Sequence, residues 1–277
     1  MKKTKKQLRK EATLLANRIS QNLKHANECN DDPLSKTLST FTSIQVKLRR
    51  RRTKSKSQTK EEASNETDED VHNNKNVTIQ FYKSLPERLL QPCLDLFRQN
   101  MGHMYNKSSW GLNMEEKKKE LLHESARFLL VIDDGDDIDS ERLQSSGSRT
   151  GIGSANDDND DDPHPHPQLL AFSHFRFEVD DDDQPTQEVL YLYEIQISPV
   201  VQRSGMGKRF MQILEIMAMQ MKMRSVMLTV FKINQDAMTF YQKLKYDIDE
   251  SSPSRFGDEA DYEILSKIVY SEVGEKK

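Results

Sequence analysis

Residues 190–208 place a strand pattern, a glycine loop and a helix pattern in direct succession, and this order constrains the fold more than any other part of the sequence. An apolar run at 190–197 stops at Ser198-Pro199. Gly205 and Gly207 follow, just before a helical pattern. Glycines let backbone amides approach an anion, and a helix N-terminus adds partial positive charge. The stretch therefore predicts a site for a phosphate-bearing ligand.

Charge is unevenly distributed along the 277 residues. Residues 1–60 hold 17 Lys and Arg against 4 Asp and Glu, although the whole chain has a net charge of -4. The cluster at 47–60 is typical of a nuclear-import or RNA-binding patch. A basic arm on an acidic body suits contact with nucleic acid, with the ribosome or with an import receptor.

Two cysteines, Cys29 and Cys93, give neither a disulfide framework nor a cysteine zinc site, which favours a reducing compartment. The His-Pro alternation at 163–167 lacks preorganised partners, so no metal is predicted. The sequence has no apolar run of about 18 residues and no signal-peptide core. We expect a soluble intracellular protein that makes no membrane contact and is a monomer.

Three regions are expected. Residues 1–76 form a basic, largely helical or disordered region with a linker, 77–270 form the folded domain, and 271–277 are a tail. Within the domain, 133–167 is an acidic low-complexity stretch that predicts a disordered insertion. A helix at 2–24 is either solvated or loosely docked, or it binds a partner. Pro92 either kinks its helix or marks the helix start.

Hydrophobic periodicity predicts a domain of about seven strands and four helices. Two of the strands, at 169–180 and 190–197, are predicted to pair as an antiparallel hairpin. The expected strands are 77–81, 127–133, 169–180, 190–197, 225–231, 246–248 and 262–268, and the expected helices are 85–101, 115–124, 207–221 and 234–245.

Two motifs in this order resemble those of the GCN5-related N-acetyltransferase (GNAT) superfamily. The first is Gln202-x-x-Gly205-x-Gly207, and the second is a helix that begins at Asn234 and carries Ala237 and Phe240-Tyr241. The resemblance implies an α/β (α+β) domain with a mixed, mostly antiparallel sheet of about seven strands and helices on both faces. The sheet would be splayed between the fourth and fifth strands, with acetyl-CoA bound in the splay.

A narrower resemblance covers about 75–268. The strings AFSHFRF at 171–177, VLY at 189–191, VMLTVFK at 226–232 and YEILS at 262–266 are similar to those of the NatD class of N-alpha-acetyltransferases. That class acetylates histone four and histone two-A at a Ser-Gly-Arg-Gly start. The resemblance implies histone tails as partners and a location in nucleus and cytoplasm. The acidic insertion, the long basic N-terminal region and the lack of a Cys/His-rich tail depart from the class.

The resemblance also implies site residues. The backbone of the strand end would pair with the pantetheine arm, the glycine loop would wrap the pyrophosphate, and Asn234 would contact the cofactor arm or simply cap its helix. The implied acetyl-CoA residues are Ile195, Gln196, Ile197, Gln202, Arg203, Ser204, Gly205, Met206, Gly207, Lys208 and Asn234.

Glu194 is the implied catalytic base. A free α-amine has a pKa of about 7.7–8.0 against about 10.4 for lysine, so an N-terminal acceptor needs only modest base assistance. Strict alternation would place Glu194 with Leu190 and Leu192, opposite Tyr191 and Tyr193. A β-bulge would turn it toward the tyrosines. The alternative is a structural salt bridge. Tyr241 is a candidate acid for the leaving thiolate or a packing residue.

The remaining implied residues would bind the substrate. Glu178 and Asp180 share a strand face and would receive the substrate ammonium and arginine, or would simply continue an acidic edge. The full set is Tyr105, Trp110, Glu178, Asp180, Tyr191, Tyr193, Thr229 and Tyr262. Two rival functions remain: a GNAT enzyme acting on lysine or polyamine amines, and an inactive acetyl-CoA-binding or chromatin-binding module.

Overall fold

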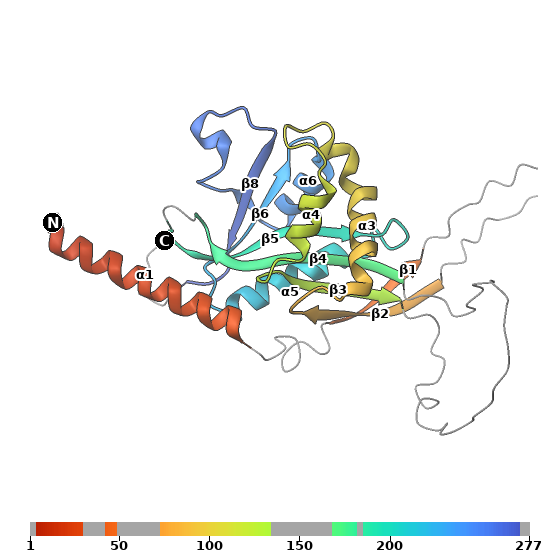
Figure 1. The fold of residues 1–277 in the computed structure, drawn as a ribbon, viewed down its shortest axis with the longest axis horizontal. Coiled ribbons are helices and arrows are strands. Elements are labelled where there is room, and N and C mark those ends of the chain that lie inside the picture. The colour runs from red at the N-terminus through yellow and green to blue at the C-terminus, as the bar shows by residue number, and fades with distance from the viewer. Residues whose placement is uncertain (1–3, 30–41, 49–72, 134–167, 182–184, 272–277) are drawn as a thin grey trace, which may run out of the picture.

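The computed structural model describes residues 4–29, 42–48, 73–133, 168–181 and 185–271 (Figure 1). These residues form one eight-stranded sheet in the order β1-β2-β3-β4-β5-β6-β8-β7. Every neighbouring pair is antiparallel except β5 and β6, which are parallel. The strands are β1 Ser43–Leu48, β2 Asn73–Tyr82, β3 Arg127–Asp133, β4 Gln168–Val179, β5 Glu188–Ile197, β6 Ser225–Phe231, β7 Asp247–Ile248 and β8 Tyr262–Ile268.

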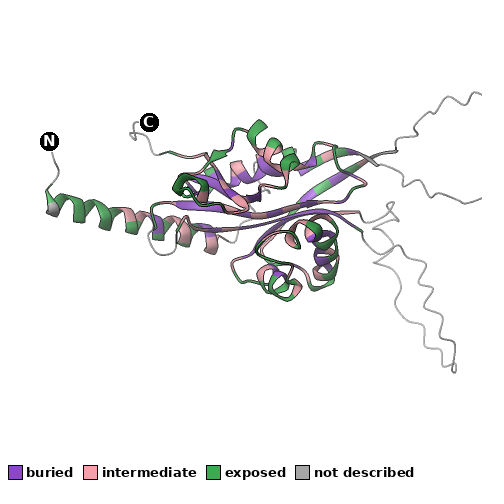
Figure 2. Cartoon of the chain, turned by 90° about the horizontal axis from the view of Figure 1, so that it is seen from above, coloured by how far each residue is buried: buried purple, intermediate pink, exposed green. Residues whose placement is uncertain are grey.

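Helices cover both faces of the sheet, as Figure 2 shows. They are α1 Lys5–Glu28, α3 Glu87–Tyr105, α4 Met114–Leu121, α5 Met206–Gln220 and α6 Gln235–Lys243, with a short 3-10 helix, η2, at Pro253–Phe256. The larger apolar core lies under α5 and includes Phe210, Leu214 and Met217. A second core lies under α3 and α4 and includes Leu89, Leu121 and Phe128. The predicted mixed sheet with helices on both faces is confirmed.

The parallel pair β5 and β6 separates partway along its length. Pairing runs from Val189 opposite Ser225 to Leu192 opposite Leu228 and then ends. Beyond that point β5 remains paired with β4, and β6 remains paired with β8. This is the predicted splay between the fourth and fifth expected strands. It leaves the inner edges of both strands open toward a ligand.

Strand β1 was not among the expected elements, which accounts for the eighth strand. It pairs with an N-terminal extension of β2, from Ser43 opposite Thr78 to Leu48 opposite Asn73. The sequence around β1 is short and lies between basic and polar stretches, so periodicity could not separate it from a linker. Pro92 lies inside α3, which begins at Glu87, so it does not mark the helix start.

The first helix docks on the domain with its C-terminal half. Ile19 and Ala26 are buried, and Asn22 Nδ2 donates to Glu188 Oε1 at 2.7 Å. Asn27 Nδ2 donates to the Phe177 carbonyl at 3.2 Å. Leu8 and Leu14 in the other half are exposed. Docking rather than free solvation therefore describes its second half.

Some expectations fall on residues that the structure does not describe. They are the acidic insertion beyond Asp133, most of the basic cluster at 47–60, and the tail at 272–277. None of the helices in the described ranges combines the length and apolar character needed to cross a bilayer.

Candidate active site

The central feature is a β-bulge in β5. His174 of β4 pairs with Glu194, whereas the next residue, Phe175, pairs with Leu192, so Tyr193 is the extra residue. Leu190 and Leu192 belong to the core under α5. After the bulge, Ile195 and Ile197 pack against that same core. The predicted bulge is thus present, and Glu194 lies on the sheet face covered by α3 and α4.

A small cavity of about 120 Å³ opens where β5 and β6 separate. Its walls come from α3, the loop after α3, the ends of both strands and the start of α6. It brings together eight of the predicted site residues, which are Tyr105, Trp110, Tyr193, Glu194, Ile195, Gln196, Thr229 and Asn234, together with Tyr241. The cavity therefore joins the expected acceptor side to the expected donor side.

Aromatic rings form one wall of the mouth. Trp110 lies 5.1 Å from Tyr262 and 5.1 Å from Phe231, centroid to centroid, and Tyr105 lies 5.0 Å from Phe231. The backbone N–H of Ser109 donates to Asp261 Oδ2 at 2.6 Å, which ties the loop after α3 to the segment before β8. Trp110 is 49% exposed. Aromatic side chains that are held in place but partly exposed to water are suited to contact a short, extended peptide.

Tyr191 and Tyr193 continue this wall along β5. The Tyr191 hydroxyl lies 2.5 Å from Thr229 Oγ1, and the Tyr193 hydroxyl donates to both Glu178 carboxylate oxygens at 3.2 Å. The Arg176 guanidinium lies 4.3 Å from the Tyr193 ring centroid. Glu178 is therefore connected to the pocket through Tyr193.

Asp180 takes a different position from Glu178. Its carboxylate accepts the backbone N–H groups of Asp181, Thr186 and Gln187 at 2.9 to 3.1 Å and also pairs with the Thr186 hydroxyl. It organises the turn between β4 and β5 and lines a separate cavity of about 710 Å³. The structure does not bring Asp180 to the pocket around Glu194.

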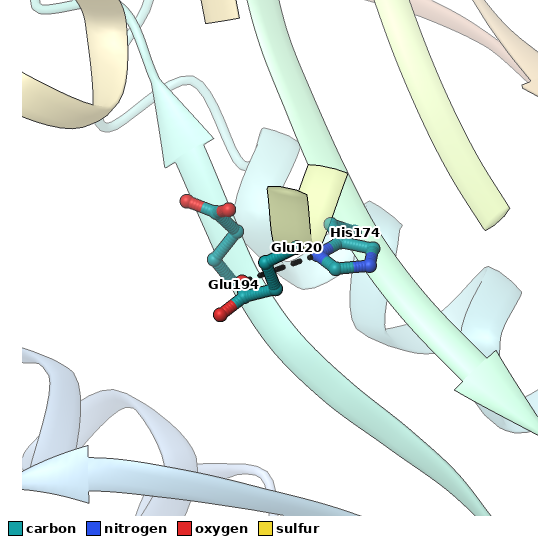
Figure 3. Close-up of side chains that lie close together, drawn as sticks. All are labelled: Glu120, His174 and Glu194. Carbon is teal, nitrogen blue, oxygen red and sulfur yellow. Dashed lines mark ion pairs between the residues drawn. The ribbon is translucent and has the colours of Figure 1, made fainter. Parts of the chain in front are cut away.

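Glu194 belongs to a buried ionic cluster made by three elements (Figure 3). Its Oε1 lies 3.5 Å from Lys117 Nζ, and its Oε2 accepts from Gln196 Nε2 at 3.1 Å. Lys117 Nζ also lies 2.6 Å from Glu120 Oε1. His174 Nδ1 lies 3.5 Å from the same Glu120 oxygen. Both the catalytic reading and the salt-bridge reading of Glu194 are therefore compatible with its position.

The charge states of this cluster follow from its surroundings. Burial lowers the pKa of His174, and the nearby Glu120 and Glu194 charges only partly oppose this, so the imidazole is neutral at neutral pH. Burial raises the pKa of Glu120, but His174 and Lys117 together bring it down to about 2. Burial lowers the pKa of Lys117, but the negative charges of Glu194 and Glu120 outweigh this effect. The pKa therefore lies above the usual value for lysine, and the side chain stays charged.

Ligand atoms of Glu120, His174 and Glu194 lie within 4.8 Å of one another, and donors of these types can hold a metal ion. In this structure the ammonium of Lys117 supplies the positive charge between the two carboxylates. The cluster therefore forms an ion-pair network in which Lys117 is the cation.

The glycine loop faces the open edge of β5. Gly205 has φ +88° and forms the N-cap of α5 without any side-chain cap, which leaves the first amides of the helix for an outside acceptor. A Cβ on Gly207 would lie 3.3 Å from the Phe240 ring and 3.4 Å from Ile197 Cδ1. This loop fits an anionic ligand that approaches through backbone contacts.

Other residues that were predicted to bind acetyl-CoA make contacts within the glycine loop or with neighbouring segments. Gln202 Nε2 donates to the Ile197 carbonyl at 3.0 Å, and Ser204 Oγ donates to the Val201 carbonyl at 2.6 Å. Arg203, with φ 63°, lies 3.4 Å from Asp236. The Met206 side chain is buried in the core, whereas Lys208 is exposed.

Asn234 caps α6, because its Oδ1 accepts the Ala237 N–H at 3.1 Å, and it also lines the cavity. The two roles considered for Asn234 are therefore compatible. Tyr241 lines the cavity as well, and burial raises the pKa of its hydroxyl, which keeps it protonated.

Several residues of the site were missed at the sequence level. Lys117 and Glu120 come from α4, a helix rich in charged residues that the sequence predicts without marking any of them for the site. Asn100 of α3 donates to Gln196 Oε1 at 3.1 Å and to the Ile197 carbonyl at 3.2 Å, which braces the bulged strand. None of these three residues belongs to a sequence motif that would have identified it, because each matters only through contacts between distant elements.

Part of the chain is similar to a known protein family. A family model described as the acetyltransferase (GNAT) family matches residues 144–246. The eight-stranded splayed sheet has the GNAT fold, and the matched range contains β4, β5, α5, β6 and α6.

Solved structures are similar at low sequence identity. NAA60 of Arabidopsis thaliana in complex with acetyl-CoA is 12% identical over 69% of this chain and 99% of that chain, with a TM-score of 0.44. The ribosomal-protein-S18-alanine N-acetyltransferase of Escherichia coli is 13% identical over 72% and 99%, with a TM-score of 0.41. The PaiA N-acetyltransferase of Thermoplasma acidophilum, in complex with coenzyme A, is 13% identical over 69% and 99%, with a TM-score of 0.42.

Proposed function

We propose that this protein is a GNAT acetyltransferase that transfers the acetyl group of acetyl-CoA to the α-amine of a protein N-terminus, with the Ser-Gly-Arg-Gly tails of histone four and histone two-A as substrates. The observation that carries the proposal is the bulge at Tyr193, which turns the Glu194 carboxylate into a cavity rimmed by Tyr105 and Trp110. The sequence similarity to the NatD class supplies the choice of tail.

The chemistry needs one proton acceptor. An α-amine with a pKa of about 7.7–8.0 is partly neutral near pH 7, so Glu194 has only to accept the remaining proton, directly or through one water. The neutral amine attacks the thioester carbonyl carbon, a C–N bond forms, and the C–S bond breaks. For an amine that binds in its neutral form, the one proton that the nitrogen loses on acylation goes to Glu194. For an amine that binds as the ammonium, Glu194 first passes the ammonium proton to water and then takes this second one. The Tyr241 hydroxyl, which lines the cavity, would protonate the departing thiolate.

The arginine of the tail would be read at Glu178. This carboxylate is half-buried next to Tyr193, on the strand adjacent to Glu194. A carboxylate in such a position can accept charge-assisted hydrogen bonds from a guanidinium. Asp180 is engaged in its own turn, so in this proposal it contributes to the shape of the substrate entrance rather than to the pocket itself.

The decisive experiment is mass spectrometry of peptides incubated with the protein and acetyl-CoA. Both peptides start Ser-Gly-Arg-Gly and contain the same internal lysine. The first has a free α-amine, whereas the α-amine of the second is blocked. We expect a single acetyl group on the α-amine of the first and none on the second. Efficient modification of the blocked peptide would favour a lysine acceptor, and no transfer to either would favour a binding module.

The proposal extends to location. Histone tails exist both on newly made chains and in chromatin, so an enzyme for them would be present in cytoplasm and nucleus. The basic N-terminal region is proposed as the targeting element, through an import receptor, the ribosome or nucleic acid. Removal of residues 1–72 would alter location, as seen by microscopy of tagged protein, and the tagged full chain is the control.

A further inference from the structure

We propose that Lys117 is a positioning residue for Glu194: its ammonium is a built-in cation that holds the Glu194 carboxylate at the cavity and balances its negative charge. The inference rests on the proposed acetyl transfer and deepens it, because it assigns to helix α4 a part in the reaction. Lys117 itself does not line the cavity and is not expected to touch the substrate.

The geometry of the cluster is specific to Lys117. Its side chain is 6% exposed, and its Nζ lies between Glu120 at 2.6 Å and Glu194 at 3.5 Å. The same ammonium lies 4.5 Å from the centroid of the Phe97 ring, which packs against its stem. By contrast, Lys119 two residues later is 72% exposed and pairs with Glu116. One lysine of α4 is therefore committed to the site, and another remains on the surface.

The two carboxylate oxygens of Glu194 have different neighbours. Oε2 accepts from Gln196, which is in turn held by Asn100. Oε1 has no hydrogen-bond donor within the described part of the chain, and Lys117 at 3.5 Å is its charged neighbour. The carboxylate is thus held from one side by a neutral amide and from the other by a full positive charge, with Oε1 free to accept a proton.

Burial makes the ammonium necessary. The Glu194 side chain is 5% exposed, and an isolated carboxylate at that depth would take up a proton rather than stay charged. A protonated carboxyl group cannot act as the base for an ammonium. Lys117 offsets the desolvation of Glu194 and so preserves the form that the reaction uses.

The other charged and titratable groups around Glu194 do not replace Lys117. Glu120 from α4 is negative, His174 from β4 is neutral, and Tyr105 and Cys93 from α3 are protonated because burial raises both pKa values. Further along β4, Arg176 and Glu178 face Tyr193 instead. Among the described groups on these elements, Lys117 is the cation in direct reach of Glu194.

The test is the pH dependence of kcat for four single variants on the peptide that the wild type acetylates. For Lys117→Met we expect kcat near pH 7 to fall about tenfold or more and the acidic limb of the profile to move up by about one to three pH units. The deficit should narrow at higher pH, where the unpaired carboxylate ionises. The dissociation constant for acetyl-CoA should change little, because Lys117 is remote from the glycine loop.

Three further variants serve as comparisons, and the first of them separates charge from packing. Lys117→Arg keeps the charge and should restore the acidic limb to near its wild-type position. Glu120→Gln removes a negative neighbour of Glu194, so its acidic limb should stay in place or move to lower pH, opposite to Lys117→Met. Lys119→Met changes an exposed lysine of the same helix and should leave both kcat and the profile unchanged.

A purely structural role gives a different result. If Lys117→Met lowers kcat and the melting temperature without moving the acidic limb, or if Lys117→Arg is no better than Lys117→Met, the inference is refuted. In a Glu194→Gln background, Lys117→Met should cause no further loss of kcat. If the wild-type protein does not acetylate an α-amine at all, the proposed function fails instead, and the pH comparison is made with the acceptor that mass spectrometry identifies.

Discussion

At the proposed donor side of the pocket, which comprises residues 195–208 and Asn234, the chain presents backbone: open amides at the N-terminus of α5 and the unpaired edge of β5. At the proposed acceptor side, which comprises the residues around Glu194, it presents side chains from α3, α4, β4 and β5. The donor side depends on local sequence, whereas the acceptor side depends on contacts between segments far apart in the chain. Substitutions should therefore act differently on the two sides.

The largest expected effect is on the acceptor side. Glu194→Gln keeps the shape and the hydrogen bond from Gln196 but removes the base, so kcat should fall about a hundredfold or more. The dissociation constant for acetyl-CoA should stay within about twofold of the wild-type value. Steady-state kinetics with calorimetric titration of the cofactor measures both. An unchanged kcat would remove Glu194 from the mechanism.

The matching change on the donor side is Gly207→Val. Its side chain would collide with Phe240 and Ile197, which already lie at 3.3 and 3.4 Å from the position of a Cβ. We expect the KM for acetyl-CoA to rise about tenfold or more, a loss of roughly 1.4 kcal/mol, with a smaller change in the KM for the peptide. A variant that raises only the peptide KM would contradict the division into two sides.

A smaller effect is expected where the acceptor side meets the substrate tail. Glu178→Gln should raise the KM about fivefold for a Ser-Gly-Arg-Gly peptide, because one charge-assisted hydrogen bond is weakened. The same variant should treat a Ser-Gly-Gln-Gly peptide like the wild type does. Asp180→Asn serves as a comparison: its carboxylate lies outside the pocket, so its effect should be similar for both peptides.

The smallest effect concerns stability. Because burial lowers the pKa of His174 below its value in the unfolded chain, the unfolded state binds more protons as pH falls through about 6.5. Stability should therefore decrease as pH is lowered from 7 toward 5. In His174→Phe, which keeps stacking with Phe128 and Tyr193, the melting temperature should depend less on pH over this window. If the melting temperatures of the two proteins change with pH in parallel, His174 does not contribute to the pH dependence of stability.

Glu120 contributes in a separate window. Its folded pKa of about 2 lies below the usual value for glutamate, so its stabilisation is present above about pH 4.5 and is lost between that value and pH 2. Extending the same melting experiment below pH 4.5 measures this contribution.

The contrast between the two sides also explains how much of the molecule could be predicted. Gly205, Gly207 and the helix cap at Asn234 form short motifs, so the donor side and the strand order around it followed from sequence. The orientation of Glu194 followed only with a bulge supplied by family resemblance, since alternation alone pointed it toward the core. Lys117 and Glu120 could not be predicted, because their burial arises when α4 packs over β4 and β5, which no local pattern encodes.

Asp180 gives the opposite lesson. Its position on the same face as Glu178 was predicted from the pleat, but the turn after β4 engages its carboxylate with four groups of its own hairpin. A face assignment predicts direction and not the competition from nearby backbone donors. Turn residues close to a strand end are therefore weak candidates for substrate contacts.

The bulge at Tyr193 has a genetic consequence. Substitutions at this position change one ring, but loss of its codon would remove the extra residue and make β5 regular. Either Glu194 would then turn into the apolar core under α5, or the part of β5 before it would reverse its two faces. In a deep mutational scan that includes single-codon deletions, position 193 should tolerate some aromatic replacements while its deletion is as damaging as truncation of the gene.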